Sequence, residues 1–301
     1  MTIAAAMILD ALFGEPDWLW RRLPHPAVLV GRLIGWLDSA LNRGAAQRIK
    51  GAFALALALT AALAAALLIR ALPLHPLPEI IAGAVLLAQR SLSDHVGDVA
   101  RALRSGLDEG RNSVAMIVGR KVDALDEPGV ARAAIESAAE NLSDGVVAPL
   151  FWFALGGLPG LAAYKALNTA DSMIGYRTDR HREFGWAAAR LDDLANFIPA
   201  RLTALLIAIA HGGAAPMRAA LRDARLHRSP NAGWPEAAMA AHLGVALSGP
   251  RLYDEGPSDD PFVYPEGRRD AGPHDIERAR RMLWRVWALC LVFAILVAVL
   301  G

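Results

Sequence analysis

The chain has 301 residues, of which 54% are hydrophobic and 20% are charged, and its mean hydropathy is +0.31. Its formal net charge of +1 provides no large basic field, which argues against a nucleic-acid-binding protein. It contains one cysteine, Cys290, and this count excludes a disulfide within the chain, a multi-thiolate zinc site and CxxC redox chemistry. The apolar residues form blocks, which indicates an all-α, polytopic integral membrane protein with broken or re-entrant segments.

The N-terminal part predicts two helices and then a membrane span. Residues 1–13 form a short apolar helix without the basic start of a signal peptide, so we expect no cleavage. Residues 24–42 predict an amphipathic helix, in which His25 is interpreted as a cap or packing residue rather than a ligand. Residues 51–69 contain nineteen residues without a charge, about the length that crosses ~30 Å of hydrocarbon at ~1.5 Å per residue. The proline-rich stretch 72–78 ends this span.

The middle of the chain alternates between polar and apolar stretches. Residues 79–107 predict one long helix, and residues 108–143 are polar enough to lie in water. Two further apolar stretches, 145–164 and 194–210, either both cross the membrane or both enter it and return. The sequence Gly-Gly-Leu-Pro-Gly interrupts the first of them, which supports a re-entrant hairpin because each arm is only ~10 residues, or ~15 Å of helix.

The C-terminal part predicts a basic segment, a loop and a second clear span. Residues 218–228 are strongly basic, and the prolines and glycines of 249–275 indicate a long loop. Asp275 is the expected N-cap of a final helix that contains the apolar block 286–300. We therefore expect one membrane-embedded domain over 1–301, with cytoplasmic polar segments near 97–143, 165–193 and 217–283.

Arginine and lysine residues orient the two clear spans. Basic side chains precede each of them, and none follows the second: these are Arg43, Arg48 and Lys50 before the first span, and Arg278, Arg280, Arg281 and Arg285 before the second. Because basic flanks stay in the cytoplasm, the first span should begin there and the C-terminus should face outward. We expect the inner membrane as the location, with the active site facing the cytoplasm.

The first candidate site is a stripe of carboxylates. Glu136, Glu140 and Asp144 fall at i, i+4 and i+8 of a predicted helix, where like charges cost a few tenths of a kcal/mol per pair. Such hard oxygen ligands fit a site for Mg²⁺ or a cationic substrate, whereas the simpler interpretation is a solvated helix face. The stripe runs directly into an apolar segment, where carboxylates are costly, and this position favours a functional role.

The second candidate site combines oxygen ligands with guanidinium groups. Asn168 and Asp171 share a helix face at i, i+3, and Gly175 is expected to free the backbone after them. Three arginines follow at Arg177, Arg180 and Arg182. This combination suits a magnesium-bound phosphate, and an ordinary basic membrane flank is the alternative.

The third candidate site lies at the mouth of the stretch 194–210. Asp192 and Asp193 precede this stretch, with Asn196 one turn deeper and Pro199 as an expected kink.

Two arginines accompany these carboxylates. Arg190 and Arg201 are eleven residues apart, close to three helical turns, so they are expected to share a face. Arg201 either pairs with a buried acid to hold helices together or binds a carboxylate or phosphate, and the sequence does not separate these roles. No HExxH, GxxxxGK[ST] or strand-associated GxGxxG motif is present, so any ATP must be bound in another way.

These stretches resemble the membrane proteins of cobalamin biosynthesis called CobD or CbiB, the adenosylcobinamide-phosphate synthases. The resemblance covers nearly the whole chain. Its motifs begin with LDALFGEPDWLWRRLPHPAVLVGRLIGWLD and continue with ESAAENLSDGVVAPLFWFALGGLPGLAAYKALNTADSMIGYRTDRHREFGWAAARLDDLANFIPARLTALL. The later stretch RSPNAGWPEAAMAAHLGVALSGPRLY is also similar to the family. Three ordered motifs of this length are highly specific.

The resemblance implies an ATP-dependent ligase that joins adenosylcobyric acid to (R)-1-aminopropan-2-yl phosphate, giving adenosylcobinamide phosphate. Such chemistry calls for Mg²⁺ beside ATP, for cations on phosphates and for a base. We assign these roles to the candidate residues: metal ligation to Glu140, Asp144 and Asp171; phosphate or substrate binding to Lys165, Asn168, Arg177, Arg180 and Arg201; catalysis to Glu136, Asp192 and Asp193. Other late enzymes of the pathway are the expected partners in the membrane.

Two rival interpretations remain. The non-catalytic AmpE-like proteins are a distant branch of the same superfamily and are associated with regulation of β-lactamase. A transporter would also have broken helices with charges inside the membrane. The carboxylate stripe, DSMIGYR and ARLDD favour the catalytic branch over the first rival, and the small number of clear spans and lack of paired halves argue against the second.

Overall fold

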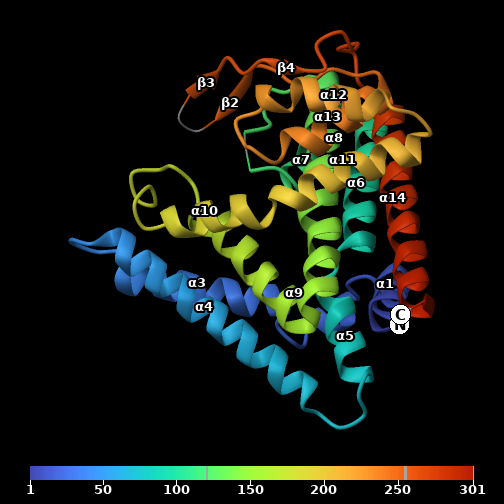
Figure 1. Cartoon of the computed structure of the whole chain (residues 1–301). Helices are drawn as coiled ribbons and strands as arrows, with labels where there is room; N and C mark the ends of the chain where they lie inside the picture. Colours follow the sequence, from blue (N-terminus) through green and yellow to red (C-terminus); the bar gives the residue numbers. More distant parts are fainter. Residues whose placement is uncertain (120, 254–255, 301) are drawn as a thin grey trace. The chain divides into compact units, whose positions relative to one another are not determined.

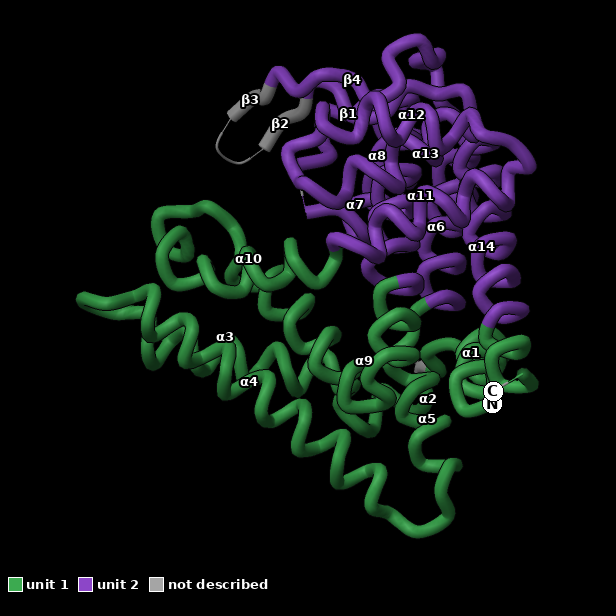
Figure 2. The backbone as a smooth tube through the Cα atoms, in the orientation of Figure 1, with its two compact units in different colours: residues 1–88, 148–196, 294–301 green, residues 89–147, 197–293 purple. Residues whose placement is uncertain are grey.

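A computed structural model describes residues 1–119, 121–253 and 256–300, with the backbone alone described at 17, 251–253 and 256–258. It divides into two compact units (Figure 2). Unit 1 comprises residues 1–88, 148–196 and 294–301, and unit 2 comprises residues 89–147 and 197–293. The expectation of one membrane-embedded domain stays a prediction.

Unit 1 is helical (Figure 1). Its helices are α1 (Thr2–Phe13), α2 (Asp17–Trp20), α3 (Pro26–Leu41), α4 (Gln47–Arg70), α5 (Leu77–Leu86), α9 (Ala148–Ile174) and α10 (Trp186–Ala195). The sequence predicted α1, α3 and α4 to within a few residues.

His25 caps α3, because its Nδ1 accepts a hydrogen bond from Ala27 N at 3.2 Å while Nε2 lies 3.2 Å from Val85 O. The interpretation of His25 as a cap is confirmed.

Unit 2 combines helices with short strands in its described residues. The helices are α6 (Gln89–Ser105), α7 (Leu107–Ala115), α8 (Glu127–Asn141), the π-helix η1 (Leu142–Val147), α11 (Phe197–His211), α12 (Ala215–Asp223), the 3₁₀ helix η2 (Ala224–Leu226), α13 (Gly233–Leu243) and α14 (Pro273–Leu300), whose last turns belong to unit 1. The strands are β1 (Leu247–Ser248), β2 (Arg251–Tyr253), β3 (Gly256–Ser258) and β4 (Phe262–Val263).

Short strands refine the prediction of a long loop over 249–275. β1 pairs antiparallel with β4, and β2 pairs antiparallel with β3, as two-stranded ribbons. Such short strands carry too few residues for a periodic signal in the sequence.

Within the described part of the chain, three stretches are long and apolar enough to cross a membrane: α4, the continuous helical stretch Glu127–Ile174, and α14. Only 22% of the apolar window of α4 and 11% of that of α14 is buried within the protein, so most of their side chains are left to face lipid. The pair α10 and α11 also passes this test when its two helices are taken together. The helical membrane fold is confirmed, while the sidedness of each segment stays a prediction.

The predicted single helix over 79–107 is wrong. The chain leaves helical geometry at Leu87, whose ψ of 157° is extended, and α6 begins at Gln89. This stretch contains no glycine or proline at the break, so its composition gave no stop signal.

The expectation that 108–143 lies outside the membrane stays a prediction, but α8 within it is not a solvent-exposed helix. Most of α8 is buried in the core of unit 2, where it packs against α6, α7 and α13. Alanines fill much of this helix, and their small side chains allow close packing with little hydropathy signal.

Asp275 acts within the last helix rather than before it. α14 begins at Pro273, and the carboxylate of Asp275 reaches back to accept the backbone N–H of Gly272 at 3.1 Å. This is the reciprocal half of a capping box, in which the third helical residue satisfies the N-cap backbone. The N-cap is therefore Gly272, three residues before the predicted Asp275.

The interruption predicted in 145–164 is confirmed as a break in α9. Gly157 adopts φ 61° and ψ −158°, outside helical geometry, and the second arm turns back from there toward α10 (Figure 1). A Cβ on Gly160 would lie 2.4 Å from the carbonyl oxygen of Trp152, so the two arms approach closely beside the turn. Whether this hairpin is re-entrant stays a prediction.

A buried carboxylate from α5 accepts a hydrogen bond from the backbone at the break in α9. Glu79 is 7% exposed, and its Oε1 accepts the N–H of Leu158 at 3.3 Å, while Oε2 lies 3.3 Å from His75 Nε2 and 3.9 Å from Arg70 Nε. The first amides of a helix have no partner within it, so Glu79 supplies an acceptor that the second arm lacks. No motif around Glu79 in the sequence predicts this role.

Replacing Glu79 by alanine is expected to lower the free energy of unfolding by about 1–3 kcal/mol, because the buried Leu158 N–H would lose its acceptor. Glu79→Gln keeps a carbonyl oxygen at this position and should cost less. Thermal unfolding in detergent measures both variants. Equal losses for the two variants would contradict the assigned hydrogen bond.

Candidate functional site

The polar centre of unit 1 lies where the second arm of α9 packs against α10. Asp192 is 8% exposed, and its two carboxylate oxygens accept hydrogen bonds from Asn196 Nδ2 at 2.9 Å and from Asn168 Nδ2 at 3.4 Å. Tyr164 donates its hydroxyl to Asn196 Oδ1 at 2.8 Å. We call Tyr164, Asn168, Asp192 and Asn196 the Asp192 network.

Helical spacing builds this network. Tyr164 and Asn168 stand at i, i+4 on α9, while Asp192 and Asn196 stand at i, i+4 across the end of α10, so each pair presents one face to the other. The indole N–H of Trp152 donates to the carbonyl of Ala195 at 3.2 Å and satisfies a group that the helix end leaves free. The carboxylate of Asp192 is therefore held in a fixed orientation.

Charged groups surround the neighbouring carboxylate. The guanidinium charges of Arg190 and Arg177 act on Asp193, which is partly buried. Arg177 and Arg190 are exposed, so both remain accessible to an anionic ligand. The second and third predicted sites thus meet in unit 1, through Asn168 with Asp192 and through Arg177 with Asp193.

Gly175 is needed for space rather than for backbone freedom. A Cβ on this residue would lie 2.0 Å from Asp171 Oδ1 and 2.7 Å from the Asp171 carbonyl oxygen. The φ of Gly175 is not positive, so this position does not require the wider backbone range of glycine that the sequence suggested. Gly175 instead leaves room for the Asp171 carboxylate to fold back over the end of α9.

Arg180 pairs with a carboxylate that the sequence analysis missed. Its guanidinium forms an ion pair with Asp38 of α3, which also accepts from Asn42 Nδ2 at 2.8 Å and lies 3.4 Å from His181 Nε2. Burial would raise the pKa of Asp38, but the hydrogen bonds from Asn42 and Arg180 and the charges of Arg180 and His181 hold it below its usual value. The ion pair anchors the segment that follows α9, and phosphate binding by Arg180 stays a prediction.

The lowered pKa of Asp38 predicts a pH dependence of stability. A carboxyl whose pKa is lower in the folded state adds stability above its unfolded-state pKa of about 4, and this contribution is lost as the pH falls through the folded-state value. We expect Asp38→Asn to lose less thermal stability than the unmodified chain between about pH 5 and pH 3. Thermal melts across this range, with Asp179→Asn as control, test it, and parallel curves for Asp38→Asn and the unmodified chain would contradict it.

The three carboxylates of the predicted stripe lie in different surroundings. Glu136 is buried and Glu140 is exposed, both on α8, and Asp144 is partly buried in the π-helical turn η1. Glu136 Oε1 accepts the backbone N–H of Ser248 at 2.7 Å and so holds β1 against α8. Catalysis by Glu136 and metal ligation by Glu140 and Asp144 stay predictions.

Arg201 contacts other residues of unit 2. Its NH1 donates to Asn231 Oδ1 at 2.8 Å and to Phe197 O at 2.9 Å, and the guanidinium lies 4.7 Å from the centre of the Trp234 ring. These partners are an amide, a carbonyl and an aromatic ring rather than the buried acid of the structural alternative. Both that alternative and substrate binding by Arg201 stay predictions.

The continuous helix from which Arg190 and Arg201 were expected to share a face is interrupted, and the shared face itself stays a prediction. α10 ends at Ala195 and α11 begins at Phe197, so the stretch 194–210 is not one continuous helix. Pro199 lies in the first turn of α11 and has no N–H to donate back to Ala195, which favours a break at Asn196 rather than a kink within a helix.

No three His, Cys, Asp or Glu side chains among the described residues form a group that could hold a metal ion by itself. Mg²⁺ that accompanies a nucleotide commonly uses only one or two protein carboxylates, because phosphate oxygens and waters complete its octahedron. In unit 1, Asp171, Asp192 and Asp193 are the candidates for such a partial set. The predicted Mg²⁺ site stays a prediction.

Comparison with known proteins decides the family. The family described as CobD/Cbib protein matches residues 3–283. A protein of Brucella suis named cobalamin biosynthesis protein CobD is 48% identical over 318 residues, covering 100% of this chain and 97% of the relative. The chain belongs to the CobD/CbiB family. Its family therefore places it in cobalamin biosynthesis.

Further relatives support the same assignment. Proteins with the same printed name are 50% identical in Rhizobium meliloti, over 93% of this chain and 90% of the relative, and 47% identical in Rhodobacter capsulatus, over 100% and 99%. No solved structure matches the chain. As a CobD/CbiB member, the chain carries the Asp192 network within the matched residues, and Tyr164 is the network member that the sequence analysis overlooked. Its i, i+4 spacing to Asn168 was the available signal.

Proposed function

We propose that the chain catalyses ATP-dependent amide formation between adenosylcobyric acid and (R)-1-aminopropan-2-yl phosphate, giving adenosylcobinamide phosphate. Membership of a cobalamin-biosynthesis family supports the pathway, and the resemblance of the three long motifs supports this reaction within it. The structural observation that carries the proposal is the buried carboxylate of Asp192, held by two amides beside Asp193 and its two arginines.

The chemistry of the reaction requires an activated acyl group. A free carboxylate is a poor acyl donor, so its oxygen first attacks the γ-phosphoryl group of ATP, which gives an acyl phosphate and ADP. The amine then attacks the acyl carbon, and inorganic phosphate leaves as the amide forms. Bound Mg²⁺ would neutralise charge on the triphosphate.

The residues of the site fit two parts of this reaction. The donor enters as an ammonium and must lose a proton before it attacks, which a fixed carboxylate can accept. Asp192 is the proposed base, because Asn168 and Asn196 orient its two oxygens. Arg177 and Arg190 are the proposed partners of substrate phosphates, because both guanidiniums are exposed near Asp193.

The test uses the purified full chain in detergent with cobyric acid, the aminopropanol phosphate, ATP and Mg²⁺. Product that forms only when ATP and the amine are both present supports the proposal. If a well-folded preparation forms no product under any of these conditions, the proposed reaction is excluded. The non-catalytic, AmpE-like alternative is then favoured. Co-purification with late enzymes of the pathway tests the further proposal that corrin intermediates pass between membrane-held partners.

A further inference from the structure

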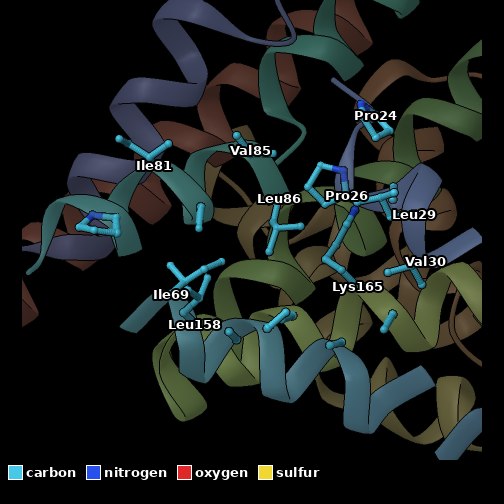
Figure 3. Close-up of a pocket in the computed structure, with 18 of the residues that line it drawn as sticks. Pro24, Pro26, Leu29, Val30, Ile69, Ile81, Val85, Leu86, Leu158 and Lys165 are labelled. Atoms are coloured by element: carbon cyan, nitrogen blue, oxygen red, sulfur yellow. The ribbon is translucent and has the colours of Figure 1, made fainter. Parts of the chain in front are cut away.

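Unit 1 contains a large apolar pocket on the other side of the second arm of α9. It has a volume of about 760 Å³ and is walled by α2, α3, α4, α5 and α9, together with their connecting loops (Figure 3). Its lining includes Trp20, Leu29, Ile69, Ile81 and Leu158. Lys165 is the one charged residue among the described residues that line it, and Figure 3 shows its side chain extended into the space that Pro26 also lines.

The second arm of α9 separates this pocket from the Asp192 network. Tyr164 and Asn168 belong to the network, whereas Lys165 and Thr169, each one position further along the helix, line the pocket. One residue step rotates a helical position by ~100°, so the two sets face different directions. The pocket is therefore a separate feature from the proposed catalytic centre.

The surroundings of the pocket make lipid available to it. α4 is long and apolar enough to cross the membrane, and 22% of its apolar window is buried. Its exposed side chains, Leu63, Leu67 and Leu68, alternate along the helix with the pocket-lining Ala62, Ala65, Ala66 and Ile69. An acyl chain that packs on the exposed face of α4 can enter the pocket without leaving an apolar environment.

The charge of the pocket selects among lipids. Cationic side chains between membrane helices bind anionic headgroups, whereas an apolar wall alone does not distinguish one headgroup from another. We propose that this pocket binds the acyl chain of an anionic phospholipid, with the ammonium group of Lys165 on the lipid phosphate region. This inference does not depend on the proposed ligase reaction, and it gives Lys165 a lipid phosphate in place of the substrate phosphate that the sequence suggested.

The test is native mass spectrometry of the purified full chain with phosphatidylglycerol or with phosphatidylcholine that has the same acyl chains. We expect one retained phosphatidylglycerol per chain, with at least 10-fold weaker retention of phosphatidylcholine. Ala62→Phe fills the pocket and should reduce phosphatidylglycerol retention at least 10-fold. Ala64→Phe is the matched control, because Ala64 is exposed on α4 and does not line the pocket.

Two further measurements separate the contribution of the Lys165 charge from that of the apolar wall. Lys165→Met should bind both lipids about equally, and inorganic phosphate should not compete with phosphatidylglycerol. Ala82→Leu fills the pocket from α5 and repeats the test if Ala62→Phe fails to fold. Equal retention by the pocket-filling and control variants, equal binding of the two lipids by the unmodified chain, or displacement by free phosphate would each overturn the proposal.

Discussion

Asp192→Asn is expected to slow amide formation by about 10²–10⁴-fold, which is the usual contribution of a positioned general acid or base. Asparagine preserves the shape of the side chain and can still accept from one neighbouring amide, so thermal stability should change little. It cannot accept the proton of the attacking ammonium. The measurement is the rate of adenosylcobinamide phosphate formation at saturating ATP, together with a thermal melt of the same preparation.

Two further variants separate a catalytic role from a structural one. Asp179→Asn makes the same chemical change at an exposed position of the polar segment and should leave the rate near that of the unmodified chain. Tyr164→Phe removes the hydroxyl that donates to Asn196, so a positioning role predicts a smaller loss, of the order of 10-fold, without loss of the fold. A normal rate for Asp192→Asn would exclude it as the base, whatever the outcome for Tyr164.

The sequence predicted the membrane helices because their signal is local and strong. The nineteen uncharged residues over 51–69 match the length of a membrane span, and α4 extends this block by only a few residues at either end. The break at Gly157 was also predictable, since three glycines and a proline within five residues disfavour a continuous helix.

Features that depend on tertiary packing were not predictable in this way. The helix break at Leu87 has no marker in its own residues, and α8 looked polar although the core of unit 2 surrounds it. The π-helical geometry of η1, where Asp144 lies, likewise has no marker in the sequence. Burial by the surrounding core, which the sequence does not reveal, separates the buried Glu136 from the exposed Glu140.

The candidate site shows the same contrast between residues recognisable within their own motifs and pairings that only the fold creates. Asn168, Asp192 and Asn196 were identified within their own motifs, but only the fold pairs α9 with α10 and places the two amides on one carboxylate. The ion pair between Asp38 and Arg180 joins residues 142 positions apart and has no sequence pattern. An isolated sequence therefore suggested chemically suitable residues without showing which of them meet.

Gly157→Ala is expected to destabilise the protein by about 1–3 kcal/mol, the second large effect. A φ of 61° with ψ near −158° is a region that glycine alone adopts readily, because a Cβ there clashes with the residue's own backbone. Neighbouring atoms are not the cause, since the nearest to an added Cβ is Glu79 Oε1 at 3.6 Å. The cost is therefore backbone strain at the turn of the α9 hairpin.

Gly156→Ala is the matched control for this prediction. An added Cβ on Gly156 meets nothing within 4 Å, and its backbone does not adopt a positive φ. Fluorescence-detected size-exclusion chromatography after heating measures the apparent melting temperature of both variants in detergent. We expect a drop for Gly157→Ala and almost none for Gly156→Ala. Equal behaviour would mean that the hairpin relaxes at no cost, and the orientation of Tyr164 and Asn168 on its second arm would then not depend on this turn.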